Sequence, residues 1–474
     1  MEFSTQLPGK TIKALASAVD SGMHRHVETL AKLVEVPGIA WPEFDRQPLD
    51  ASARQVRKLL REAGFPLAAI HSASGEGSAS GEGSASGEGG PAVIATRAAA
   101  AGMPTVLLYA HHDVQPVGPL DEWETEPFVL AQGRDRLWGR GAADDKSGIV
   151  LHLAAIQALE QVVGPLNGLG YAIFIEGEEE CGSPTLRPLL DQAGQQLRAD
   201  VAVVADSGSW KIGTPALTTS LRGLVDGTIE VRVLEHALHS GTYGGPLPDA
   251  LTALARLMST FHHDDGSVAV EGIASAESEG PELGENRFRR EAGVPASVDL
   301  IGKGSLTSRL WTQPALSFIG LDAQTVGAAA NTLLPSATVK FSLRLPPGND
   351  PVEAMEAVRR HALCHAPFGA EVTFTPGSMS RPYSVNPTSV MAKKALWALG
   401  TAWGNEAVCM GTGGSIPFVA ALAERFPDCP ILITGAEDPD SRAHGANESV
   451  HRGELRNAIL AEALFLASLR EAST

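Results

Sequence analysis

Short apolar segments alternate with longer amphipathic segments along most of the chain. Residues 10–35 and 50–64 carry apolar side chains at helical spacing, which predicts two amphipathic helices. Further along, several short segments are apolar almost throughout and rich in Val, Ile and Leu, as expected for strands buried on both faces. They read PAVIATR, TVLLYA, YAIFIEG and VAVVADS, with helical patterns between the later ones. This alternation predicts an α/β fold with a mostly parallel sheet and helices on both faces.

The middle of the chain follows a different order. Its patterns predict strand–helix–strand–strand–helix–strand, the order of a ferredoxin-like domain. The last part of the chain returns to helices around one strand, ILITGA, and a closing helix. We therefore expect a first domain formed by residues 1–215 and 381–474, with a second domain, residues 216–380, inserted into it.

Residues 72–89 repeat the hexapeptide SASGEG. Such a small, polar, glycine-rich segment cannot bury a face, so we expect a mobile loop within the first domain. A repeat this short is not a solenoid unit. The repeat carries no residue with obvious chemistry.

Charge and composition exclude several classes of function. The chain has 474 residues and a formal net charge of −18, which argues against nucleic acid or an anionic membrane as a partner. The absence of an apolar run of 18 or more residues predicts no transmembrane helix, and the N-terminus lacks the pattern of a signal peptide. The four cysteines form no CxxC pair, which indicates reduced thiols in a cytoplasmic protein.

Five short acidic and histidine motifs are candidates for metal binding. They are His111-His112-Asp113, Asp144-Asp145-Lys146, Glu179-Glu180, Asp206 and His444. Each follows or closely neighbours a predicted strand, and open α/β sheets gather ligands at the carboxyl ends of strands. Each motif alone could be a solvated charged turn. Their order on one α/β scaffold favours a site for two divalent metals.

The chemistry of these residue types suits such a site. His111 and Asp113 are two positions apart, so in extended backbone they point to the same side, and the carboxylate can fix the tautomer of the imidazole. The two oxygens of Asp144 can bridge two metals about 3.5–4 Å apart. In the Glu179-Glu180 motif, one glutamate can bind metal while its neighbour takes a proton from water.

The motifs HHDVQP, GRGAADDKSG, EGEEECGS, VADSGS and RAHGANE resemble those of the M20 family of dinuclear zinc metallopeptidases. The resemblance runs from about residue 20 to the C-terminus and is strongest to the carnosinases and broad-specificity dipeptidases. It implies a zinc-exopeptidase-like catalytic domain with an inserted lid and dimerisation domain. It also implies two divalent metal ions, with zinc as the expected metal and manganese or cobalt as alternatives.

The resemblance assigns a role to each metal ligand. One metal would be bound by His111 and Asp206, the other by Glu180 and His444, and both by Asp144. Two further residues would act beside them. Asp113 would orient the imidazole of His111, and Glu179 would be the general base. The peptide bond after Asp144 would be cis.

The resemblance also implies residues that contact the substrate. His239 of the inserted domain would reach the active site of a neighbouring subunit and stabilise the oxyanion, which implies a homodimer. Asn331 and Arg344 would hold the substrate carboxylate, together with Gly414 and Ser415. Each of these has a purely structural alternative, since Arg344 could be a surface strand residue and the glycine an ordinary helix start.

The expected function is metal-dependent hydrolysis of dipeptides. Asp206 stands where many deacylases of the family carry Glu, which favours peptide substrates, whereas RAHGANE lacks the Ser-Gln that often follows the last histidine. An N-acyl amino-acid deacylase or a carboxypeptidase of the same family is the nearest alternative. A catalytically silent binding module is the alternative of another class, and a purely structural zinc site would favour cysteine ligands instead.

Overall fold

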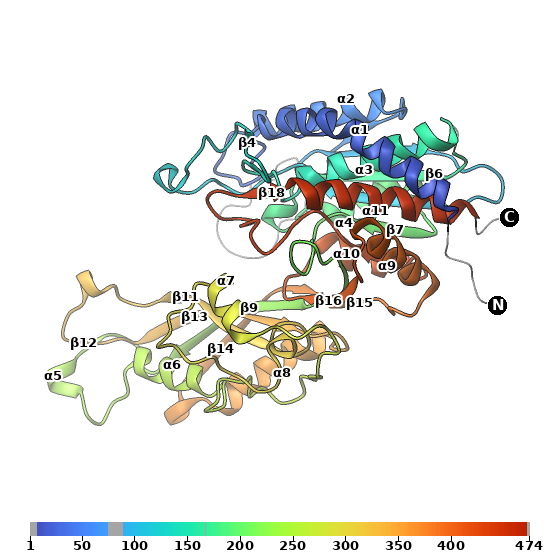
Figure 1. The fold of residues 1–474 in the computed structure, drawn as a ribbon. Coiled ribbons are helices and arrows are strands. Elements are labelled where there is room, and N and C mark those ends of the chain that lie inside the picture. The colour runs from blue at the N-terminus through green and yellow to red at the C-terminus, as the bar shows by residue number, and fades with distance from the viewer. Residues whose placement is uncertain (1–6, 74–88, 166, 472–474) are drawn as a thin grey trace. The chain divides into compact units, whose positions relative to one another are not determined.

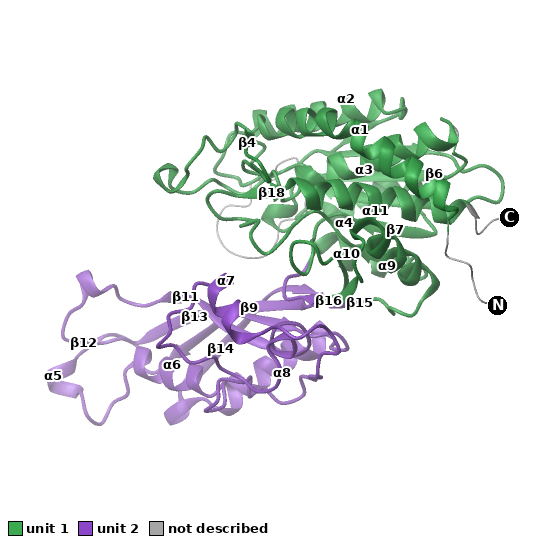
Figure 2. Ribbon diagram, viewed as in Figure 1, with its two compact units in different colours: residues 1–219, 385–410, 416–474 green, residues 220–384, 411–415 purple. Residues whose placement is uncertain are grey.

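The computed structural model describes residues 7–73, 89–165 and 167–471, and the chain divides into two compact units (Figure 2). Unit 1 comprises Met1–Thr219, Val385–Met410 and Ile416–Thr474, and unit 2 comprises Ser220–Ser384 and Gly411–Ser415. Most of the SASGEG loop expected at 72–89 lies outside the described residues. The inserted unit thus begins and ends near the expected 216–380 but also takes in the five residues 411–415.

Unit 1 is built on a sheet whose strands run in the order β1-β2-β6-β3-β7-β17-β8. The four central strands, β6, β3, β7 and β17, are parallel, whereas β1, β2 and β8 pair antiparallel at the two sides. The bounds are β1 (Ala69–His71), β2 (Ala92–Arg97), β6 (Gly170–Glu176), β3 (Thr105–His111), β7 (Val201–Val204), β17 (Ile431–Ile433) and β8 (Ala216–Leu221). The short strands β15 (Tyr383–Ser384) and β16 (Val408–Thr412) pair with β8.

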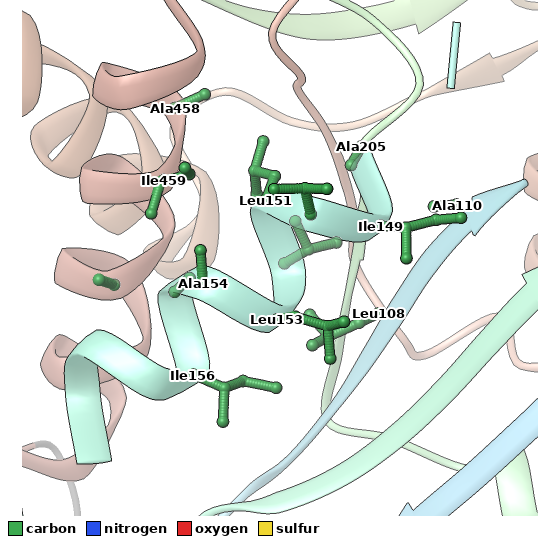
Figure 3. Packing of buried hydrophobic residues seen from close by; sticks show 14 of the residues in the cluster. Leu108, Ala110, Ile149, Leu151, Leu153, Ala154, Ile156, Ala205, Ala458 and Ile459 are labelled. Atoms are coloured by element: carbon green, nitrogen blue, oxygen red, sulfur yellow. The ribbon is translucent and has the colours of Figure 1, made fainter. Parts of the chain in front are cut away.

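Helices cover both faces of this sheet. They are α1 (Gly9–Val34), α2 (Arg46–Glu62), α3 (Lys146–Val163), α4 (Leu186–Ala193), α9 (Val390–Trp403), α10 (Pro417–Arg425) and α11 (Arg452–Glu471) (Figure 1). Successive side chains of β3 point to opposite faces. Leu108 and Ala110 pack against α3, and beyond α3 lies Ile459 of α11 (Figure 3). Tyr109 faces the other way and stacks on Phe418 of α10, with ring centroids 3.9 Å apart. The expected α/β class is confirmed.

The register of the parallel strands determines where the functional motifs meet. His111 pairs with Glu176 at the ends of β3 and β6. Val204 of β7 pairs with Tyr109 on one side and with Ile433 of β17 on the other. The loops that follow these four strands therefore leave the sheet at the same edge, as expected for an open α/β sheet.

Unit 2 has the ferredoxin-like order of elements that its sequence predicts. The order along the chain is β9 (Gly223–Arg232), α6 (Ala250–Ser259), β11 (Ala315–Asp322), β13 (Ser336–Leu345), α8 (Pro351–Cys364) and β14 (Glu371–Ser380). In the sheet the strands run β11-β13-β9-β14, and every neighbouring pair is antiparallel. Alternate residues of β9, among them Val225, Ile229 and Val231, face a core shared with α6 and α8.

Smaller elements complete both units. Unit 2 also holds β10 (Leu238–His239), α5 (Ser240–Tyr243), α7 (Glu285–Glu291) and β12 (Thr332–Leu333). In unit 1, β4 (Ala131–Gln132), β5 (Arg136–Trp138) and β18 (Ser449–His451) form a small sheet of their own. All four cysteines are free thiols. Among the described helices, none combines the length and the apolar composition needed to span a membrane.

Candidate metal centre

Asp144 lies between two histidines that are 333 positions apart in the chain and that both belong to unit 1. One of its carboxylate oxygens, Oδ1, is 3.0 Å from Nε2 of His111, and the other, Oδ2, is 3.0 Å from Nε2 of His444. Each carboxylate oxygen thus faces a different imidazole nitrogen. This is the arrangement that a carboxylate needs to share two cations, each of which also has a histidine ligand.

The other two expected ligands lie at the same place. Oε2 of Glu180 is 3.1 Å from Nε2 of His444. The ligand atoms of His111, Asp145 and Asp206 lie within 4.8 Å of one another. The structure therefore brings together all five residues that the resemblance assigned to metal binding. The peptide bond between Asp144 and Asp145 is cis, as the resemblance implied.

The orientation of His111 is compatible with binding a cation through Nε2. Its Nδ1 lies 3.1 Å from the main-chain oxygen of Asp113, which can only accept a hydrogen bond. Nδ1 therefore carries a proton, which leaves Nε2 as the nitrogen that can bind a cation. Nε2 shares a hydrogen bond with Oδ1 of Asp144 at 3.0 Å, and a cation bound by both groups would take the place of that proton. Imidazole and carboxylate donors together suit zinc, manganese and cobalt.

Asp113 also holds the loop that carries both glutamates. Its carboxylate accepts hydrogen bonds from the backbone N–H of Glu179 at 3.2 Å and of Glu180 at 3.0 Å, and lies 3.4 Å from Nδ1 of His111. One buried carboxylate thus contacts His111 on β3 and holds the loop after β6. Burial raises the pKa of Glu179 well above its usual value, and the neighbouring charge of Asp206 raises it further. A raised pKa suits a general base that must exchange protons near neutral pH.

The pKa values of the centre show how strongly its charges interact. Burial alone would raise the pKa of Asp144, but hydrogen bonds from His111 and His444 lower it well below its usual value. Hydrogen bonds to Asp144 and Glu180 raise the pKa of His444 to about 11. Burial raises the pKa of Asp206 to about 7. The carboxylates lie close together and repel one another, so the binding of positively charged groups or ions at the centre is favourable.

Three residues at this edge received no role from the sequence, although Asp145 and Gln115 lie within the quoted motifs. Oδ2 of Asp145 accepts a hydrogen bond from the backbone N–H of His111 at 3.2 Å. The side-chain amide of Gln115 donates to Oε2 of Glu180 at 2.8 Å. Glu437 brings a carboxylate oxygen within 4.8 Å of ligand atoms of Asp144 and Asp206. Glu437 follows strand β17, so the rule that locates the candidate ligands at strand ends also points to it.

The five predicted substrate-contact residues all belong to unit 2, where they form two groups. His239 pairs with Thr332 between β10 and β12, and Ser240 donates its backbone N–H to the oxygen of Asn331 at 2.9 Å. His239 and Asn331 are thus adjacent, and both are exposed.

The second group lies around 413–415. Nη1 of Arg344 is 3.4 Å from the hydroxyl of Ser415, the residue after Gly414. Arg222, which the sequence did not single out, donates from Nε to the oxygen of Gly413 at 3.1 Å. Burial lowers the pKa of Arg222 to about 10, and the charge of Arg344 lowers it further. Two guanidinium groups near one glycine-rich turn favour an anion at this place.

Comparison with known proteins relates the chain to a family of peptidases. Residues 107–468 match Peptidase family M20/M25/M40. The cysteinylglycine-S-conjugate dipeptidase of Corynebacterium striatum is 34% identical over 379 residues, covering 79% of this chain and 83% of that protein. The Beta-Ala-His dipeptidase of Rattus norvegicus is 26% identical over 488 residues, covering 98% and 96%.

Solved structures share the fold. The di-peptidase Dug1p from Saccharomyces cerevisiae superposes with a TM-score of 0.82 at 21% identity, covering 97% of this chain and 98% of that one. Human carnosine dipeptidase 1 gives a TM-score of 0.78 at 23% identity, covering 98% and 100%. Both agree with a sheet-based unit that carries an inserted second unit.

Proposed function

The chain belongs to Peptidase family M20/M25/M40, and on that premise we propose that it is a metal-dependent dipeptidase. The observation that carries the proposal is the position of Asp144, whose two oxygens each face a different histidine nitrogen at 3.0 Å. Relatives from Corynebacterium striatum and Rattus norvegicus are both named as dipeptidases, which favours dipeptides over N-acyl amino acids as substrates.

We propose that the centre binds two divalent cations, with zinc as the expected metal and manganese and cobalt as alternatives. When bound, such a pair polarises a carbonyl group and makes water acidic enough to act as a nucleophile at neutral pH. His111 and Asp206 would hold one cation and Glu180 and His444 the other, with Asp144 shared. The donor set of imidazoles and carboxylates supports this assignment, since each group offers an atom of the kind that these cations bind.

The residues around the cations have separate tasks in the proposed reaction. Glu179 takes a proton from the attacking water and later gives it to the amine that leaves. Its burial and its raised pKa support this role. Asp113 orients His111 and holds the Glu179–Glu180 loop in place through two backbone hydrogen bonds.

Unit 2 is proposed to recognise the substrate. Arg344 and the turn at Gly414 and Ser415 would bind the substrate carboxylate, helped by Arg222 and Asn331. The contact of 3.4 Å between Arg344 and Ser415 supports this grouping. His239 would stabilise the oxyanion in the active site of a second copy of the chain, in a homodimer. Its exposure on the short β10–β12 pair supports a role at an interface.

The four free thiols support a reducing, cytoplasmic location.

One experiment tests the proposal as a whole. The full-length protein is stripped with a chelator, reloaded with Zn²⁺, Mn²⁺ or Co²⁺, and assayed on Cys-Gly, β-Ala-His and other dipeptides beside acetylated and succinylated amino acids. We expect activity that depends on added metal and that prefers dipeptides. A preference for acylated amino acids would favour the deacylase alternative. Full activity of the stripped protein would contradict the metal mechanism.

A further inference from the structure

Glu448 binds the loop that carries Asp144. Its side chain is fully buried, four residues after His444 and directly before β18. Oε1 accepts hydrogen bonds from the backbone N–H of Ala143 at 2.9 Å and of Asp144 at 3.0 Å. Oε2 accepts one from the backbone N–H of Gly141 at 2.9 Å. A single carboxylate thus holds three backbone N–H groups of the loop that ends at Asp144, the proposed shared ligand.

Arg140 connects the same carboxylate to the segment of His444. The guanidinium is 1% exposed, and its Nη1 donates to Oε2 of Glu448 at 2.7 Å. Its Nη2 donates to the main-chain oxygens of His444 and Pro116, each at 3.2 Å. The two segments are more than 300 positions apart in sequence, and the Arg140–Glu448 pair joins them directly beside the ligands.

We propose that Glu448 and Arg140 are positioning residues that set the relative position of Asp144 and His444 and thereby the affinity of the centre for divalent cations. This inference rests on the proposed metal-dependent function. Neither side chain would bind metal. Glu448 acts through the backbone of Asp144, and Arg140 acts through the main-chain oxygen of His444.

Physical reasoning favours a role in metal binding as well as in stability. The three backbone N–H groups are buried, so no water replaces the carboxylate if it is removed. The loop would then move to satisfy them, and the carboxylate of Asp144 would move with it. A two-metal site tolerates little displacement of its shared ligand, and loss of groups that orient ligands typically lowers metal affinity about 10- to 100-fold.

A second buried pair provides a matched control. Glu462 of α11 lies 2.9 Å from Nδ1 of His152 of α3, and both side chains are nearly inaccessible. This pair also joins an early segment to the C-terminal part of unit 1. Its two members bond to each other, and Nε2 of His152 lies 2.9 Å from the main-chain oxygen of Tyr109, which is not a proposed metal ligand. Glu462→Gln therefore disturbs the core to a comparable degree without touching the centre.

The test measures metal affinity directly. Full-length wild type, Glu448→Gln and Glu462→Gln are titrated with Zn²⁺ and, separately, with Mn²⁺ against a competing chelator, and the thermal midpoint of each is measured in excess chelator. A glutamine side chain at position 448 has the same shape as glutamate, but it offers only one acceptor oxygen to the three backbone N–H groups that bond to the two oxygens of Glu448. We expect a metal dissociation constant raised about 10- to 100-fold for Glu448→Gln and changed less than about twofold for Glu462→Gln.

Equal metal affinity in Glu448→Gln and wild type would overturn the inference, as would an equal loss in both variants, which would indicate a general effect of stability. If Glu448→Gln does not fold, Arg140→Lys decides the matter. Lysine keeps the charge but cannot donate to Glu448 and to the oxygen of His444 with one planar group. Unchanged affinity in that variant would overturn the inference. A wild-type chain that binds neither cation would instead overturn the proposed function.

Discussion

Glu179 is the side chain on which the proposed chemistry depends most. It follows β6, its backbone N–H is held by Asp113, and no metal-ligand role is assigned to it. We expect Glu179→Gln and Glu179→Ala to lower kcat by at least about 100-fold, because a positioned general base contributes about 100- to 10,000-fold. Metal content, measured by elemental analysis, should stay near that of wild type. A variant that keeps more than about a tenth of wild-type activity would show that another group is the base.

Arg344 is expected to decide whether a substrate needs a free carboxylate. Its guanidinium reaches the hydroxyl of Ser415 at 3.4 Å and lies near a second guanidinium, that of Arg222. Arg344→Met should raise KM for dipeptides about 10- to 100-fold, the usual effect of losing a hydrogen bond to a charged group. The matched substrate is the dipeptide amide, which lacks the charge. If wild type and variant discriminate equally between dipeptide and amide, Arg344 does not bind the carboxylate.

At the scale of single residues, the sequence predicts the candidate metal ligands better than the groups proposed to position them. His111 ends β3, Glu180 follows β6 and Asp206 follows β7, so the strand pattern alone places them at one edge of the sheet. The role of Glu448 depends on hydrogen bonds to the backbone at 141–144, about 300 positions away, and no local pattern encodes that pairing. Glu437 and Gln115 follow strands too, but their contacts also depend on the folded arrangement.

At the scale of elements, helix α1 contains a buried histidine that should make stability depend on pH. His26 is 7% exposed, and burial lowers its pKa to about 4, with a smaller effect from the charge of Arg25. The folded value lies below the ordinary value of about 6.5, so the unfolded chain binds more protons between pH 6.5 and 4. The contribution of His26 to the free energy of unfolding should therefore be complete above pH 6.5 and fall by at most about 3 kcal/mol on acidification.

Denaturant unfolding at several pH values measures this effect. His26→Leu should show a shallower fall between pH 6.5 and 4 than wild type, whatever its stability at neutral pH. His24 lies on the same helix with its side chain 86% exposed, so His24→Gln is the control and should follow wild type. Parallel pH curves for wild type and His26→Leu would show that His26 does not titrate as a buried group.

The elements themselves could largely be predicted because their hydrophobic periods are regular. The helices expected at 10–35 and 50–64 are α1 (Gly9–Val34) and α2 (Arg46–Glu62). The sequence predicted less well whether neighbouring strands pair parallel or antiparallel. PAVIATR forms β2, which pairs antiparallel with β6 at the side of the parallel centre. A strand's own pattern reports burial, whereas the direction of its neighbour depends on the path of the whole chain.

At the scale of the whole molecule, the inserted unit includes a segment that the sequence placed elsewhere. Residues 411–415 were expected in the second part of the catalytic domain, because they lie between two elements of that part. In the structure they belong to unit 2, where Arg222 binds the oxygen of Gly413 and Arg344 reaches Ser415. These contacts join residues about 70 and 190 positions apart, so no boundary rule based on local composition could locate them.

The proposed homodimer makes a prediction that no single variant can test. If His239 acts in the active site of the partner subunit, a site is complete only when Glu179 comes from one chain and His239 from the other. Glu179→Gln and His239→Ala homodimers should both be impaired, the latter about 100- to 1000-fold for loss of an oxyanion donor. In a heterodimer of the two variants, one of the two sites regains both residues. The other site lacks both.

Mixing the two variants in equal amounts and allowing subunits to exchange should therefore restore activity. Random pairing makes about half of the dimers heterodimers, each with one intact site, so about a quarter of wild-type activity should return. Each variant mixed with itself is the control and should stay inactive. No recovery, although gel filtration shows exchanged dimers, would mean that His239 serves its own chain or has no role in the reaction. A fully active protein with the mass of a monomer would exclude a shared site altogether, because the second chain would then contribute nothing that catalysis requires.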